Sequence, residues 1–246
     1  MTIPPYVFDP SHEVVRDFAE YSGRSVADLS RDLDDFRRLV RDEWDAQPGR
    51  TFEERARSFY PSSRTYVLDL LRVNTSRADV VAKLDRFEPR VLAAIRAQAG
   101  RRFLEFGGGT GVFCQVMAEE GRRVTYLDLP GPVADFAAWR FRRLGLDVEV
   151  LLVPPGELPS IPGSYDVVFS DAVFEHLVDP EGTARVLARS LAPGGFFALL
   201  VDLEGENPDV PMHREVEIGA LHAALEDEGL VAAFGRGGFA SGWRRA

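Results

Sequence analysis

A carboxylate followed by a glycine run is the stretch of this sequence best suited to chemistry. Glu105 stands two residues before three glycines spaced G-x-G-x-G, which are Gly107, Gly109 and Gly111. Because glycine has no Cβ, the backbone can turn sharply there and come close to a bound molecule. The dinucleotide fingerprint needs G-x-G-x-x-G, and Val112 takes the place of its third glycine. The pattern predicts a small-molecule site and disfavours a nicotinamide cofactor.

A second carboxylate, Asp128, ends a short apolar stretch at 123–127 that is typical of a buried strand. Asp128 lies 21 residues beyond Gly107, about the separation at which an acidic side chain meets the two hydroxyls of a ribose. We therefore expect this carboxylate to accept hydrogen bonds from the sugar of a nucleoside cofactor.

Groups able to move a proton occur at three places. His176 is our first candidate for a general base, because an unperturbed imidazole titrates near pH 6.5, and His213 is the second. The alternative is that His176 only caps or packs against the next helix. Tyr66 belongs with Phe59 and Tyr60 to an aromatic cluster that we expect near the site. We expect Phe59 to pack in the core, whereas the hydroxyls of Tyr60 and Tyr66 need hydrogen-bond partners. We expect the two remaining histidines, His12 and His222, at the surface.

The elements that must position these groups alternate. We predict strands at 102–106, 123–128, 147–152, 165–170 and 195–201, with helices near 112–120, 131–144, 180–191 and 214–228. Alternation of this kind favours a parallel sheet covered on both faces, whose ligands bind beyond the carboxyl ends of the strands. Gly107, Asp128 and Asp171 all stand at such ends.

Several segments from about Phe103 to Asp202 resemble the class I S-adenosylmethionine (SAM) dependent methyltransferases. Glu105 with the G-x-G-x-G spacing resembles their motif I. The stretch 165–171 is similar to their fourth strand, 174–177 to the segment after it, and 191–195 to the turn into the fifth strand. Four such segments in family order are a specific signal.

The resemblance implies a Rossmann-like, mostly parallel sheet ending in an antiparallel hairpin, here over 231–243, and SAM as the cofactor. It implies that Glu105 to Gly111 hold the methionine portion and Asp128 the ribose. The adenine site departs from the family pattern, because prolines at 154–155 precede Leu158-Pro159 where an acid is common. Either Glu157 or backbone groups would meet the adenine amine. The expected cofactor residues are Glu105, Gly107, Gly108, Gly109, Gly111, Asp128, Leu129, Glu157 and Asp171.

Residues before the predicted sheet are helical in pattern. Ser11 is a candidate cap for a helix over 12–21, Ser25 for one over 26–40, and Thr51 for one running to Phe59. We assign 1–88 to an N-terminal helical extension and 89–246 to a SAM-binding domain. In families that the chain resembles, such an extension covers the cofactor and shapes the substrate pocket. The alternative is that it stabilises the domain or makes a homodimer contact.

Composition narrows the partners. The net charge of −10, with no basic stripe, argues against nucleic acid held by phosphate contacts. No apolar run approaches the ~20 residues of a membrane span, and residues 1–5 lack the features of a secretion signal, so we expect a cytoplasmic protein. The single cysteine, Cys114, excludes an internal disulfide and fits a buried small hydrophobe. Of 29 basic residues only Lys83 is a lysine, which we interpret as the codon bias of a GC-rich bacterial genome.

The leading hypothesis is a methyltransferase acting on a small molecule in bacterial specialised metabolism. Two alternatives remain: a SAM-using cyclase or lyase on the same fold, and a non-catalytic SAM-binding partner protein. No convincing metal-ligand set is present, although Asp171 with Asp202 stays open as a pair.

Overall fold

The computed structural model describes residues 9, 11–202 and 211–246, so the segment 1–5 lies outside the described residues. At its centre is a seven-stranded sheet in the order β3-β2-β1-β4-β5-β7-β6. The strands are β1 (Arg102–Phe106), β2 (Arg123–Asp128), β3 (Val148–Leu152), β4 (Tyr165–Asp171), β5 (Leu191–Leu200), β6 (Leu230–Phe234) and β7 (Ala240–Arg245). The first five pair in parallel, and β7 runs antiparallel to both β5 and β6. The predicted mostly parallel sheet and its terminal hairpin are confirmed.

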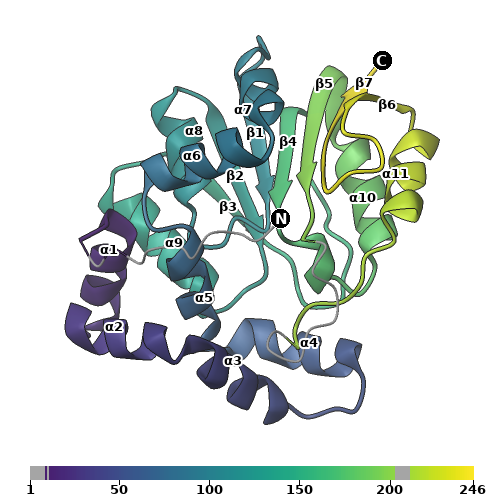
Figure 1. The fold of residues 1–246 in the computed structure, drawn as a ribbon. Coiled ribbons are helices and arrows are strands. Elements are labelled where there is room, and N and C mark those ends of the chain that lie inside the picture. The colour runs from purple at the N-terminus through teal and green to yellow at the C-terminus, as the bar shows by residue number, and fades with distance from the viewer. Residues whose placement is uncertain (1–8, 10, 203–210) are drawn as a thin grey trace.

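Helices cover both faces of the sheet (Figure 1). Side chains on β1 and β4 alternate, so that Phe103 and Phe169 join one buried cluster while Leu104 and Val168 join the other. The first cluster packs under α7 (Pro89–Arg96), α8 (Val112–Glu119) and α9 (Pro132–Arg143), the second under α10 (Pro180–Arg189) and α11 (Ile218–Asp227). Both faces are thus buried, as a parallel sheet requires.

Six helices precede this unit: α1 (Glu13–Ser22), α2 (Val26–Asp34), α3 (Phe36–Asp45), α4 (Phe52–Ser62), α5 (Tyr66–Val73) and α6 (Arg77–Phe87). In Figure 1, α2, α3 and α4 lie below the sheet. The predicted caps at Ser25 and Thr51 are confirmed, the latter as a capping box in which Thr51 and Glu54 satisfy each other's backbone amides.

Three local predictions were wrong. The cap of α1 is His12 and not Ser11, whose amide instead donates to the Asp9 carboxylate. The single helix expected over 26–40 is broken at Asp35, whose amide closes α2 by donating to Asp32 O three residues back. The fifth strand begins at Leu191 and not at Gly195, because Leu191 already pairs with Tyr165 across an irregular register.

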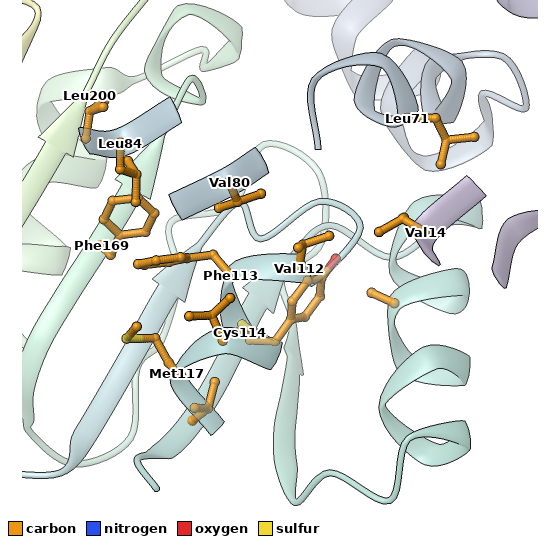
Figure 2. Close-up of a cluster of buried hydrophobic side chains, with 14 of the residues drawn as sticks. Val14, Leu71, Val80, Leu84, Val112, Phe113, Cys114, Met117, Phe169 and Leu200 are labelled. Carbon is orange, nitrogen blue, oxygen red and sulfur yellow. The ribbon is translucent and has the colours of Figure 1, made fainter. Parts of the chain in front are cut away.

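The extension and the sheet share one core. Figure 2 shows Val80 and Leu84 of α6 beside Phe113 of α8 and Phe169 of β4. All four side chains are at most 3% exposed. The boundary predicted after residue 88 therefore runs between segments that bury each other, and it stays a prediction. Across the described residues, no helix combines the length and apolarity needed to cross a bilayer.

Candidate active site

The glycine turn after β1 is restricted by its own backbone conformation and by neighbouring side chains. Gly107, Gly109 and Gly111 have φ of 72°, 52° and 73°, the left-handed region that favours glycine. A Cβ on Gly107 would lie 2.3 Å from Val173, and one on Gly111 would lie 2.5 Å from Phe141. At Gly109 the nearest atom is an ordinary 3.4 Å away. We predicted that these glycines lack a Cβ so that a ligand can approach the backbone. That reason fits Gly109 alone, because Gly107 and Gly111 make room for the side chains of Val173 and Phe141.

Asp128 at the end of β2 is bound directly to this turn. Its Oδ2 accepts the Gly109 amide at 2.9 Å and the Tyr126 hydroxyl at 3.0 Å, and its Oδ1 accepts the Leu129 amide at 2.7 Å. Burial raises the pKa of Asp128, and the two backbone donors oppose that rise. The carboxylate is thus held in place, with further acceptor positions left on both oxygens.

Glu105 lies beneath the turn and is 6% exposed. Within the part of the chain that the structure describes, its Oε2 has no hydrogen-bond partner. Burial raises the pKa of this carboxyl to about 8, against the opposing effect of a hydrogen bond from Cys114. Cys114 is fully buried, as predicted. A buried carboxyl with one unpaired oxygen suits a positively charged ligand, whose charge would favour its ionised form.

A cavity of about 710 Å³ opens from the glycine turn toward α3, α4 and α5, within the roughly 300–1,000 Å³ usual for small-molecule sites. Most of the predicted site residues line it: Tyr66, Glu105, Gly107, Gly108, Gly109, Asp128, Leu129, Glu157, Asp171, His176 and His213. Gly111 instead caps α8. The fold therefore brings the expected cofactor residues and the expected proton-transfer residues to one cavity.

His176 lies at the centre of an aromatic cluster that lines the same cavity. Its Nδ1 lies 2.8 Å from the Tyr60 hydroxyl and 3.0 Å from Met212 O, and its Nε2 lies 3.4 Å from the Tyr66 hydroxyl. The His213 ring stands edge-on at 4.7 Å. Burial lowers the pKa of His176 to about 3, so its imidazole is neutral at pH 7. Phe59 is fully buried and both tyrosine hydroxyls have partners, as predicted.

One cavity residue escaped the sequence analysis. Lys83 of α6 is only 9% exposed and its Nζ lies 2.5 Å from the Asp171 carboxylate, across the junction between extension and sheet. The signal was present, because this is the one lysine beside 28 arginines. A buried lysine that reaches a strand-end carboxylate is a candidate site residue, although we had read its rarity only as codon bias.

The structure also shows where the two remaining histidines lie, and it bears on the metal pair that the sequence analysis left open. His222 is 4% exposed, which corrects our surface prediction: its Nδ1 accepts the Gly237 amide in the β6–β7 turn. His12 is half-buried, with Nδ1 2.7 Å from the Thr75 hydroxyl. Among the described residues, no group of three or more His, Cys, Asp or Glu side chains is arranged to hold a metal ion, Asp171 and Asp202 included.

Similarity to known proteins coincides with the strands that build this site. A family model described as a methyltransferase domain matches residues 104–199. Residues 104–199 thus match the methyltransferase-domain family that the sequence resembles. Ubiquinone biosynthesis O-methyltransferase of Bordetella avium is 36% identical over 104 residues, which are 41% of this chain and 43% of that protein. The match thus spans less than half of the curated relative.

Two solved structures share the methyltransferase fold. A SAM-dependent methyltransferase from Mesorhizobium loti has a TM-score of 0.51 at 19% identity, covering 64% of this chain and 96% of that one. The [4+2]-cyclase SpnF has a TM-score of 0.51 at 17% identity, covering 76% of each chain. The cofactor of the family is SAM, and the residues here fit it: a buried carboxyl at Glu105 with one oxygen unpaired among the described residues and a fixed carboxylate at Asp128 border one cavity.

Proposed function

We propose that this protein transfers the methyl group of SAM to a small-molecule acceptor bound under α3, α4 and α5. The observation that supports this most is the continuity of the cavity, which joins the glycine turn and Asp128 to His176 and its tyrosines. When bound, SAM supplies a methyl on a positively charged sulfur, which an acceptor lone pair displaces in line. The protein's contribution is position, exclusion of water and removal of a proton.

In this proposal Glu105 and the glycine turn hold the methionine portion and Asp128 holds the ribose hydroxyls. Glu157 lines the cavity after β3, where it is placed to meet the adenine amine. Asp171 is ion-paired with Lys83, so we assign the two side chains to the cofactor together. The carboxylate can bind the ammonium group of the methionine portion, and the lysine can bind its carboxylate.

His176 is the proposed general base, and its surroundings define which nitrogen acts. Met212 O can only accept, so the 3.0 Å contact requires the proton of His176 on Nδ1. Nε2 then keeps its lone pair and faces Tyr66. A base oriented by a second group through its other nitrogen is the arrangement found in many proton-transferring sites. Tyr66 and His213 would complete the acceptor end of the site.

The broader setting is also a proposal. The arginine-rich composition and the helical extension support a role in bacterial specialised metabolism. The net charge of −10 supports a protein without a nucleic-acid partner, and we keep the expectation of a cytoplasmic location without a membrane partner. The relative's name specifies an oxygen acceptor for that protein, but the matched residues are those of the cofactor half. A homodimer contact through the extension stays open.

A second candidate function is a SAM-binding cyclase or lyase. The cyclase SpnF matches 76% of this chain, a larger share than the Mesorhizobium loti methyltransferase. The two functions differ in the fate of the cofactor, since only methyl transfer releases S-adenosylhomocysteine. The cofactor product therefore separates them.

The test follows S-adenosylhomocysteine by chromatography while the protein is incubated with SAM and a panel of phenols, catechols and amines. We expect acceptor-dependent release, reduced roughly 10²–10⁴-fold in kcat by His176→Asn with SAM affinity unchanged. His12→Asn, outside the cavity, is the matched control. SAM binding without S-adenosylhomocysteine release would favour the cyclase or lyase. Full activity of His176→Asn would remove this histidine as the base.

A further inference from the structure

A second buried carboxyl in the cavity has no use in the reaction described so far. Glu175 lies in the short helix η1 (Phe174–His176), is 1% exposed and lines the cavity. Within the described ranges, no side chain donates a hydrogen bond to either of its oxygens, and the nearby backbone amides of Glu175 and Asp202 offset only part of the effect of burial on its pKa. Leaving a buried carboxyl unpaired costs free energy, so this position is arranged for a group that the protein itself does not supply.

Glu175 adjoins the histidine cluster, because it precedes His176 in η1 and its carbonyl accepts the Arg214 amide at 3.0 Å. The charges that act on it most are those of Asp202 and Asp171, whereas Glu105 is influenced by Asp171 and Asp128. Its own charge in turn acts on Tyr60 and Tyr66, the two phenols around His176. Glu175 and Glu105 line one cavity, and Glu175 is the one of the two that adjoins the histidine cluster.

The groups around Glu175 favour a cation and do not provide one. His176 is neutral because burial lowers its pKa, and His213 lies 4.0 Å from the Asp202 carboxylate. Burial raises the pKa of Glu175 to about 8, so at pH 7 the carboxyl is protonated until a positive charge arrives. In the cavity as described, eight acidic side chains face four basic ones, and Lys83 among the four already pairs with Asp171.

Aromatic rings complete the environment. Tyr60 and Tyr66 stand edge to face with centroids 5.2 Å apart, and Tyr60 stands 5.5 Å from the His176 ring. Phenol faces beside a carboxyl attract an organic cation by cation–π and charge interactions together. A metal ion fits less well, because no metal-binding group of three or more side chains occurs in the portions of the chain described.

We propose that the methyl acceptor carries a basic amine, and that Glu175 binds its ammonium group in the cavity that Tyr60 and Tyr66 also line. This inference rests on the proposed function and adds the chemical class of the acceptor. The ammonium restores the ionised form of Glu175 and satisfies both oxygens. Neutral acceptors of the same shape can supply a hydrogen bond but no positive charge to stabilise the ionised carboxyl, and the site discriminates against them for that reason.

The test compares two probes of equal shape, 2-phenylethylamine and 2-phenylethanol, by calorimetry on protein loaded with S-adenosylhomocysteine at pH 7.5. We expect the amine to bind about 10- to 150-fold more tightly, the range for a hydrogen bond to a charged group. Titration in two buffers of different ionisation enthalpy should also show proton release, because Glu175 loses its proton when the ammonium binds. This comparison uses the wild-type protein and does not depend on a variant folding.

Variants then assign the preference to one side chain. Glu175→Gln should abolish it without changing the affinity for S-adenosylhomocysteine, whereas Glu215→Gln, an exposed control, should retain it. Equal binding of amine and alcohol, no amine binding, or an amine preference that survives Glu175→Gln would each overturn the inference. A cation site that fills only with added Mg²⁺ or Zn²⁺ would also overturn it. Failure to bind S-adenosylhomocysteine would instead overturn the proposed function.

Discussion

Single residues in this site are defined by what lies next to them. Asp128 was chosen from its place after a strand, yet its usefulness depends on three donors that fix its carboxylate, two of them backbone amides. Glu105 and Glu175 are both buried carboxyls with a pKa near 8, and only their neighbours distinguish a cofactor role from an acceptor role.

Replacing Asp128 by alanine should weaken SAM binding by about 1.5–3 kcal/mol, as for the loss of a hydrogen bond to a charged group. Calorimetry with SAM measures the change. Asp128→Asn, which keeps the shape and one acceptor oxygen, should lose less. An unchanged dissociation constant for Asp128→Ala would mean that the ribose binds elsewhere.

At the scale of elements, one arginine ties the extension to the cofactor turn. Arg140 of α9 is fully buried and donates to the Asp17 carboxylate of α1, to Thr110 O in the glycine turn and to the Gln115 amide oxygen of α8. Desolvation lowers the pKa of Arg140, and Asp17 opposes that shift. The first helix of the chain is therefore linked through one side chain to the loop that we assign to SAM.

Arg140→Met should lower the free energy of unfolding by about 3–5 kcal/mol, because it leaves Asp17 short of its buried partner and two acceptors unpaired. Urea denaturation followed by circular dichroism measures the loss. Arg143→Met is the matched control: it lies on the same helix and also pairs with Asp17, at 3.1 Å, but is 39% exposed. We expect a much smaller loss for the control, because water and salt screen an exposed ion pair. Equal losses in the two variants would contradict this assignment.

At the scale of the whole molecule, the helical extension is part of the core. Val14 and Leu71 join Val112 in one buried cluster, as Figure 2 shows, and Val80 and Leu84 reach the sheet itself. The cavity is bounded on one side by strand ends and on the other by α3, α4 and α5. Extension and sheet are thus two halves of the site.

A fragment of residues 89–246 should therefore lack the cooperative thermal unfolding of the full chain, because it exposes the apolar surface under α6. Near-ultraviolet circular dichroism during heating measures this, with the full chain as the control. A fragment that unfolds cooperatively and binds SAM would establish the boundary after residue 88 as a true domain boundary.

Local patterns in the sequence were sufficient for the parallel sheet, the glycine turn, the carboxylate after β2 and the capped helices. These features depend on neighbours within a few residues or on a period of two along a strand, and the order of segments carried the family resemblance. The burial of His222 was not predictable in this way, because it depends on the β6–β7 turn 15 residues further along. The break at Asp35 involves a local bond to Asp32 O, but no residue pattern had marked it.

Only the tertiary structure decided the site's chemistry. It paired Lys83 with Asp171, 88 residues away, and placed Tyr60 against His176, 116 residues away. It also left the Glu175 carboxyl buried with no side chain donating to it among the described residues. Whether a side chain is charged, paired or free to act depends on desolvation and on neighbours brought together by folding, and one-dimensional spacing does not contain that information.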